Sequence, residues 1–278
     1  CESITWKTND DLYEQQQLLH NRKSTQFTSR VSDERWNELH YNKKPLSSFV
    51  GQSSIGHLIA QLRLKKSVHD DIANFLHTVI IVLADHGPAT SWAHNTIVTS
   101  RAGKDLVSSV IAGLAPVGPR FGWAITDAAY HFHNAVLNQT SPDGFVKNMN
   151  QQGKQIPGIG HKIKNKYNPD SRCDILRQTW KCIVSKKYLT FALAVEEITL
   201  TKKNNLILNV DGLLAVLLLD MLCDLDYTKD EISWLITADF FNAYFVCART
   251  IWLIAHHIDQ KELDEGLYRT DYNNIYYW

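Results

Sequence analysis

The chain has 278 residues, 44% hydrophobic and 21% charged, which excludes a disordered protein and suits one large domain or two modest ones. Lys plus Arg and Asp plus Glu number 29 each, so the formal net charge is zero. This balance argues against a protein that binds nucleic acid or an acidic membrane surface through its overall charge.

The predicted elements of the N-terminal third follow a polar arm, residues 1–30. Residues 31–50 place apolar side chains among charges and a Lys-Lys-Pro turn, which predicts a hairpin or turn. From Ser53 onward the apolar residues recur with the i, i+3, i+4, i+7 spacing of a helix. A further helix is predicted over 72–84, because two aspartates precede it and Gly87-Pro88 follows it.

The rest of the chain is predicted to be mainly helical. Helical spacing or continuous apolar character marks residues 106–114, 121–137, 170–180, 191–198, 213–222 and 230–259. The segment 213–222 is apolar on nearly all sides, which predicts a buried core helix.

Two other segments are predicted to be irregular or peripheral. Residues 144–167 form the least regular part of the chain because of their Gly and Pro content. The aromatic C-terminus, residues 272–278, is expected to pack on a surface that the sequence does not identify. Since no strand pattern appears outside residues 25–45, the predicted fold class is all-α.

Five cysteines, at positions 1, 173, 182, 223 and 247, form no Cys-x-x-Cys pair and have no metal-ligand spacing. We therefore expect reduced thiols, no metal, and an intracellular chain of the cytoplasm or an organellar matrix. The longest apolar runs fall short of the ~20 residues that a membrane span needs. The first residues lack the features of a signal peptide and include no initiator Met, so we expect a processed or trimmed chain.

Three segments place polar residues in apolar or glycine-rich surroundings. His86 ends an apolar helix, where burial favours a neutral imidazole. Residues 157–162 are rich in glycine and flanked by lysines, so their backbone can approach a ligand closely. Asp211 lies in a mostly apolar stretch, where burial would raise its pKa and suit acid–base chemistry. Each feature also has an ordinary interpretation, as a structural histidine, a plain loop and an Asp-Gly turn, and spacing alone does not join them.

Five motifs in a fixed order give the sequence a family resemblance. They are Ala84-Asp85-His86-Gly87-Pro88, Arg101-Ala102-Gly103-Lys104-Asp105-Leu106-Val107-Ser108-Ser109, Gly158-Ile159-Gly160-His161, Asn205-Leu206-Ile207-Leu208-Asn209-Val210-Asp211-Gly212, and Asp259-Gln260-Lys261 with Gly266-Leu267-Tyr268-Arg269. The chain resembles the citryl-CoA lyase module of the citrate synthase superfamily, which is the C-terminal part of ATP-citrate lyase and the whole of stand-alone citryl-CoA lyases. The resemblance covers residues 25–275.

This resemblance implies a citrate synthase-like helical fold with a large domain, residues 31–133 and 235–278, and a small domain, residues 134–234. It implies a tight homodimer, alone or within a larger assembly, with the active site between the two domains. The implied reaction is cleavage of citryl-CoA to acetyl-CoA and oxaloacetate, so coenzyme A enters as a thioester and no metal is expected.

The resemblance also implies roles for single residues. Among the implied catalytic residues, Asp211 exchanges the methyl-carbon proton, His161 handles the proton on the oxaloacetate oxygen, and His86 helps to bind carboxylates. Phe121 falls where citrate synthases carry a thioester-polarising histidine, which favours the lyase branch. The implied citrate-binding residues are Arg172, Arg249 and Arg269, the last acting across the dimer. The implied coenzyme A contacts are Lys154, Gly158, Ile159, Gly160, Lys162, Lys202 and Lys203.

Four positions depart from the family pattern. Lys162 replaces an arginine, which keeps the charge and loses the two-pronged guanidinium. Trp92, Trp123 and Trp252 replace glycines, and each indole adds a side chain that can bury on the order of 200 Å². Two hypotheses therefore stay open. Either the indoles fill a remodelled helix interface in an active lyase, or they fill the pocket of an inactive relative that serves as a structural subunit.

Overall fold

The computed structural model describes residues 28–84, 87–118, 122 and 124–278. The predicted site residues His86 and Phe121, together with Trp123 and most of the predicted arm, lie outside the described residues. The chain divides into two compact units, residues 1–77 and 78–278. The predicted division into a large domain and a small domain at residues 134–234 stays a prediction.

The first unit contains the predicted hairpin. Three two-residue strands, β1 (Ser32–Asp33), β2 (His40–Tyr41) and β3 (Lys44–Pro45), form an antiparallel sheet in sequence order. A short 3-10 turn η2 (Leu46–Ser48), helix α2 (Ile55–Ile59) and the π-helical turn η3 (Ala60–Leu64) follow. Helix α3 (Asp70–Leu83) begins in this unit and continues into the second.

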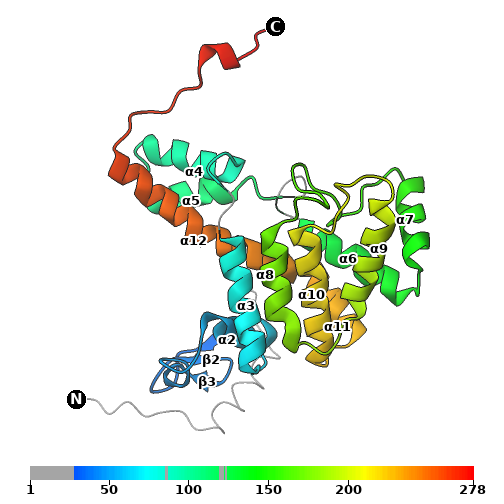
Figure 1. The fold of residues 1–278 in the computed structure, drawn as a ribbon. Coiled ribbons are helices and arrows are strands. Elements are labelled where there is room, and N and C mark those ends of the chain that lie inside the picture. The colour runs from blue at the N-terminus through cyan, green and yellow to red at the C-terminus, as the bar shows by residue number, and fades with distance from the viewer. Residues whose placement is uncertain (1–27, 85–86, 119–121, 123) are drawn as a thin grey trace. The chain divides into compact units, whose positions relative to one another are not determined.

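The second unit is a helical body (Figure 1). Its elements are α4 (Ser91–Arg101), α5 (Leu106–Leu114), α6 (Ala124–Leu137), α7 (Pro142–Gln151), α8 (Ser171–Thr179), η4 (Trp180–Cys182), α9 (Lys187–Leu200), α10 (Val210–Asp224), α11 (Lys229–Thr237), α12 (Phe240–Leu263) and η5 (Tyr272–Asn274). None of the helices in the described part of the chain combines the length and the apolar character needed to cross a membrane.

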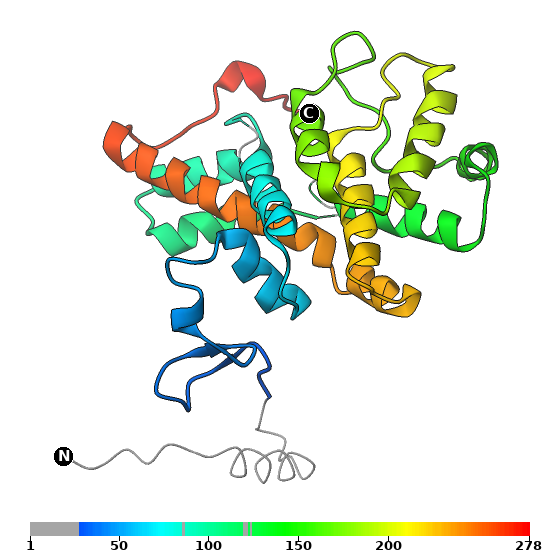
Figure 2. The same cartoon turned by 60° about the horizontal axis from the view of Figure 1, so that its bottom comes forward.

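Helix α10 forms the centre of this body, as its sequence predicts. Every residue from Leu213 to Leu222 is buried, so the helix has no solvent-facing side. It packs against α6, α8 and α9, and Figures 1 and 2 both show these helices around it. A second group of helices is formed by the long α12, which packs against α4 and α5.

Several predicted elements are confirmed in their bounds. Helix α5 covers the predicted residues 106–114, and its N-cap Asp105 accepts a hydrogen bond from the Ser108 backbone N–H. Helix α8 starts after its N-cap Asp170, as the Asn-Pro-Asp sequence predicts. The predicted helical stretch 230–259 is two helices, α11 and α12, separated at Asp239, which has a positive φ of 58°.

One prediction is wrong and one helix was not predicted. Residues 144–151, expected to be irregular, belong to α7, because Ser141 caps the helix, Pro142 opens it, and three apolar side chains share one buried face. Helix α4, which contains Ala93-His94-Asn95, was not predicted, because its buried face consists partly of Thr and Ser and so lacks an apolar pattern. The aromatic C-terminus is exposed in the single chain, with Tyr276 92% accessible, and its expected packing partner stays a prediction.

Candidate active site

Two segments far apart in the sequence meet at the N-terminus of α10. The Gly160 backbone N–H donates to the Ile207 carbonyl (2.7 Å), and the Asn209 N–H donates to the Gly158 carbonyl (3.0 Å). Gly158 has a φ of +82°, and a Cβ at this position would lie 2.4 Å from Cα of Gly212. Only glycine therefore allows this close contact between the loop and the first turn of α10.

Asn209 fixes the arrangement with a single side-chain amide. Its oxygen accepts from the Gly212 backbone N–H (3.0 Å), which caps α10, and its nitrogen donates to the Gly160 carbonyl (2.8 Å). Asp211 therefore sits in the first helical turn, directly beside the glycine-rich loop.

Burial raises the pKa of Asp211. The positive charges of Arg172 and Arg249 oppose this shift, whereas the negative charge of Asp170 adds to it. The carboxyl group is thus partly desolvated and within electrostatic reach of two arginines, and its neutral form is populated at a higher pH than usual.

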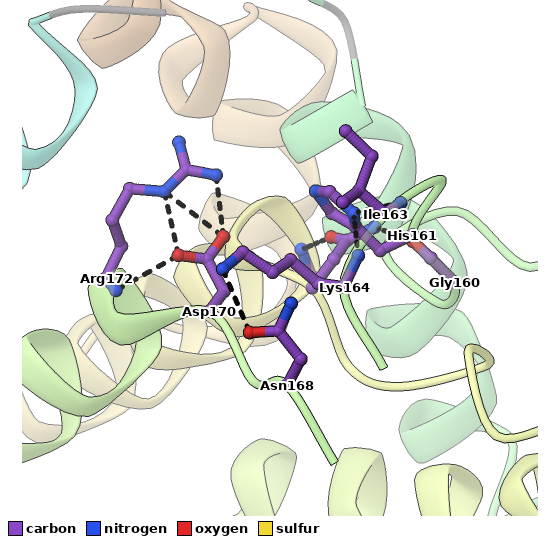
Figure 3. Close-up of polar contacts among 9 residues, drawn as sticks. Gly160, His161, Ile163, Lys164, Asn168, Asp170 and Arg172 are labelled. Carbon is purple, nitrogen blue, oxygen red and sulfur yellow. Dashed lines mark hydrogen bonds and ion pairs between the residues drawn. The ribbon is translucent and has the colours of Figure 1, made fainter. Parts of the chain in front are cut away.

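Asp170 and Arg172 form a two-pronged ion pair at the start of α8 (Figure 3). Arg172 donates from Nη2 to Oδ2 of Asp170 (2.6 Å) and from Nε to both carboxylate oxygens (3.0 and 3.1 Å). Burial alone would raise the pKa of Asp170, but the hydrogen bonds from Arg172 outweigh it and the pKa is lowered. Arg172 keeps 29% of its side chain exposed, so part of the guanidinium remains accessible.

His161 is held in one tautomer (Figure 3). Its Nδ1 accepts from the backbone N–H groups of Ile163 (3.0 Å) and Lys164 (2.8 Å), so in the neutral ring the proton is on Nε2. Burial lowers the pKa of His161, and the positive charges of Arg172 and Lys164 add to this against the opposing charge of Asp170. At neutral pH the ring is therefore an Nε2–H donor.

Arg249 lies in α12 among three aromatic rings and is only 1% exposed. Its Cζ is 4.7 Å from the ring centroid of Phe245, 5.4 Å from that of Trp252 and 5.6 Å from that of Trp92. Two of the three tryptophans expected to stand at glycine positions of the family thus lie against the same guanidinium group.

The remaining predicted residues divide into two groups. Ile159 pairs with Leu208 across the two segments, and the lysines implied for coenzyme A, Lys154, Lys162, Lys202 and Lys203, are exposed. The Lys166 N–H donates to the Asn204 carbonyl (2.9 Å), which brings the loop after His161 against the turn that carries Lys202 and Lys203. Arg269 is exposed and follows α12 in the chain, and it is not among the charged groups that act on the pKa of Asp211 in the described part of the chain.

Two residues of the site were not predicted. Asp170 was predicted only as a helix start, although its position two residues before Arg172 is compatible with an ion pair. Phe245 stands in the helical series Phe245, Arg249, Trp252, which places all three on one face and was a usable signal.

A comparison with known families assigns the chain to one of them. Residues 33–271 match the family model described as citrate synthase, C-terminal domain. The chain belongs to the citrate synthase family. The predicted resemblance to its citryl-CoA lyase branch is confirmed by curated and solved relatives.

Several relatives within the citrate synthase family are longer than this chain. It is 44% identical over 259 residues to the ATP-citrate synthase beta chain protein 2 of Arabidopsis thaliana, which covers 92% of this chain and 43% of that protein. The structure of ATP citrate lyase from Methanothrix soehngenii with citrate and coenzyme A matches with a TM-score of 0.89 and 42% identity, over 96% of this chain and 44% of that one. The chain therefore spans less than half the length of these relatives.

A shorter protein of the family has the same fold. The citryl-CoA lyase of Hydrogenobacter thermophilus matches with a TM-score of 0.77 at 21% identity, over 91% of this chain and 94% of that one. The predicted citrate synthase-like helical fold is thereby confirmed.

Proposed function

We propose that this chain cleaves citryl-CoA into acetyl-CoA and oxaloacetate. The proposal is carried by Asp211, a carboxyl group at the N-terminus of α10 with a raised pKa and within electrostatic reach of Arg172. Arg172 also acts on the pKa of His161, which is held as an Nε2–H donor. A neutral carboxyl group can deliver a proton to carbon, and a neutral imidazole can donate a hydrogen bond to an oxygen that gains charge. The solved relative that holds citrate and coenzyme A supports this substrate class.

Each described residue has one task in the proposed reaction. The citryl hydroxyl group loses its proton to solvent, and His161 stabilises the resulting oxyanion through Nε2–H. The electrons of the breaking carbon–carbon bond then pass to the acetyl carbon, which takes the proton of neutral Asp211. The Asp211 carboxylate recovers a proton from solvent, so the cleavage consumes no net proton.

Cationic residues are proposed to bind the carboxylates and phosphates of citryl-CoA. Arg172, which is partly accessible, and Arg269, from a second copy of the chain in a homodimer, are proposed to bind substrate carboxylates. Lys154, Lys162, Lys202 and Lys203 are exposed cations suited to the phosphates of coenzyme A. The Gly158–Gly160 backbone is proposed to lie against the thioester arm, since glycine permits close approach.

A second candidate function is that of a non-catalytic subunit in a larger assembly. It is favoured by Trp92 and Trp252, which lie against the guanidinium group of Arg249, the implied citrate ligand. In this case the helical body would persist while the substrate pocket is filled. The two candidates differ in whether the native chain binds coenzyme A and citrate.

Calorimetric titration of coenzyme A and then citrate, followed by an assay of oxaloacetate release from citryl-CoA, separates the candidates. For the lyase we expect micromolar binding and a loss of at least about a hundredfold in turnover for Asp211→Asn. Asp143→Asn, an exposed carboxylate in the first turn of α7, is the matched control and should keep native turnover. Binding that is absent in the native chain and restored in Trp92→Gly would instead establish the non-catalytic subunit.

A further inference from the structure

Residues 205–209 form a segment that is hydrogen-bonded both to the glycine-rich loop of the site and to helix α9. Toward the loop, the Ile207 carbonyl accepts from the Gly160 backbone N–H (2.7 Å). The Asn205 carbonyl accepts from the His161 backbone N–H (3.0 Å), and the Asn205 side-chain nitrogen donates back to the His161 carbonyl (3.2 Å). The backbone of His161 is therefore joined to segment 205–209 through both its N–H and its carbonyl.

Two side chains near the C-terminal end of α9 are bonded to the same segment. Glu196 Oε1 accepts from the Leu208 backbone N–H (2.7 Å), and Thr199 Oγ1 donates to the Leu206 carbonyl (2.7 Å). Leu208 is 2% exposed and Thr199 is 3% exposed, so little water is available to replace these partners. Because a buried N–H without an acceptor is costly, Glu196 holds the backbone at Leu208 in place.

The connection from Leu208 to the site runs through the next residue in the chain. Asn209 caps α10 by accepting from the Gly212 backbone N–H (3.0 Å) and donates to the Gly160 carbonyl (2.8 Å). Asp211 lies in the first turn of the helix that this cap begins. A displacement of Leu208 would therefore move the start of α10 and the glycine-rich loop together.

Thr199 also closes the turn that carries two of the lysines proposed for coenzyme A. Its carbonyl accepts from the backbone N–H groups of Lys202 (3.0 Å) and Lys203 (3.3 Å). Its hydroxyl group lies 3.0 Å from the Glu196 carbonyl within α9, but the shorter distance to the Leu206 carbonyl marks the favoured acceptor. The end of α9 thus holds this turn and segment 205–209 at once.

We propose that Glu196 and Thr199 are positioning residues that hold segment 205–209 in the register in which it presents His161 and Asp211 to a substrate. The proposal rests on the proposed function, in which these two residues act on citryl-CoA. Catalytic groups need support from residues behind them, because small displacements at the reacting atoms lower the rate. Glu196 and Thr199 supply this support from α9 without touching the substrate.

Hydrogen exchange followed by mass spectrometry tests the proposal on the full chain, whether or not the chain turns over citryl-CoA. Exchange in peptides covering residues 157–166 and 204–212 is compared with exchange in peptides from α12. The variants are Glu196→Met and Thr199→Val, which remove the bonding groups, and Glu196→Gln and Thr199→Ser, which keep an oxygen in each place. Oxaloacetate release from citryl-CoA is measured for the same set.

Helix α9 offers a matched control for each of the two residues. Glu197→Met removes the neighbouring carboxylate, which is exposed. Thr201→Val removes an exposed hydroxyl group that donates to the Ile198 carbonyl (2.7 Å) and not to segment 205–209. Both controls should keep native exchange and native turnover.

We expect exchange in both site peptides to be at least about tenfold faster in Glu196→Met, because the Leu208 N–H loses its acceptor and the pairing with the loop loosens. Thr199→Val should show a smaller rise, and Glu196→Gln and Thr199→Ser should stay close to the native chain. In an active chain, turnover of Glu196→Met should fall by about tenfold to a hundredfold, the size of effect that a small misplacement of reacting groups produces. Glu196→Gln should recover most of this loss.

Three results overturn the proposal. The first is native exchange in residues 157–166 in both Glu196→Met and Thr199→Val, and Thr199→Val alone decides this where Glu196→Met does not fold. The second is an equal rise of exchange in α12, which would reduce the two side chains to contributors to overall stability. The third is native turnover of Glu196→Met in an active chain. Faster exchange confined to the site peptides, in a native chain that releases no oxaloacetate, would uphold the role of both residues in holding the segment and refute the proposed lyase function.

Discussion

Replacement of Gly158 by alanine tests whether the contact between the glycine loop and α10 builds the site. The new Cβ would lie 2.4 Å from Cα of Gly212, so one of the two backbones has to move. The φ of +82° adds strain of about 1–2 kcal/mol for a residue with a side chain, and overpacking of a close contact adds about 1–3 kcal/mol. The expected loss in the free energy of unfolding is therefore about 2–5 kcal/mol.

Gly153 is the matched control for this experiment. It has a φ of +63°, yet a Cβ there has no heavy atom within 4 Å, so Gly153→Ala carries the strain without the collision. Urea denaturation of both variants, with coenzyme A titration of each, separates the two effects. We expect Gly158→Ala to be less stable than Gly153→Ala by about 1–3 kcal/mol and to bind coenzyme A more weakly. Equal stability of the two variants would refute the steric argument.

Two further predictions concern buried carboxyl groups. Because burial raises the pKa of Asp211, its contribution to stability is present at low pH and is lost as the pH rises through the raised pKa. In urea denaturation carried out from about pH 4 to about pH 8, the free energy of unfolding of Asp211→Asn should therefore rise relative to that of the native chain as the pH increases. A difference that does not change with pH would contradict this. Asp220 is fully buried and accepts from the backbone N–H groups of Tyr188 and Leu189, both at 3.0 Å, and from Ser185 Oγ at 3.1 Å. The free energy of unfolding of Asp220→Ala should fall by at least about 3 kcal/mol in thermal or urea unfolding, because three donors lose their buried acceptor. Asp224→Ala, at a more exposed carboxylate, is the control. An equal loss in the two variants would contradict the prediction.

Sequence patterns predicted the elements whose own residues decide their structure. Helix α10 is apolar on all sides and α5 has a clear N-cap, so both follow from local chemistry. Helix α4 was missed because its buried face uses Thr96 and Ser100, which become core residues only when α5 and α12 pack against them.

The candidate site was also predicted only in part, because some of its contacts depend on packing between helices. The family motifs contain Asp211 and His161, and the resemblance implies a role for Arg172; in the structure Arg172 lies within electrostatic reach of both Asp211 and His161. The contact of Trp92 with Arg249 could not be predicted from the sequence, because it depends on the packing of α4 on α12. Non-local packing of this kind leaves no periodic trace in the chain.

The position of α10 in the sequence has a consequence for synthesis on the ribosome. Helices α6, α8 and α9 all precede it in the chain, yet each packs against it. Until residue 224 has left the exit tunnel, these helices lack the apolar partner that fills the space between them, and their inner faces meet water. During synthesis there is therefore a stage at which α6, α8 and α9 have been made but α10 has not. At this stage we expect a chaperone that recognises apolar surface to bind the nascent chain.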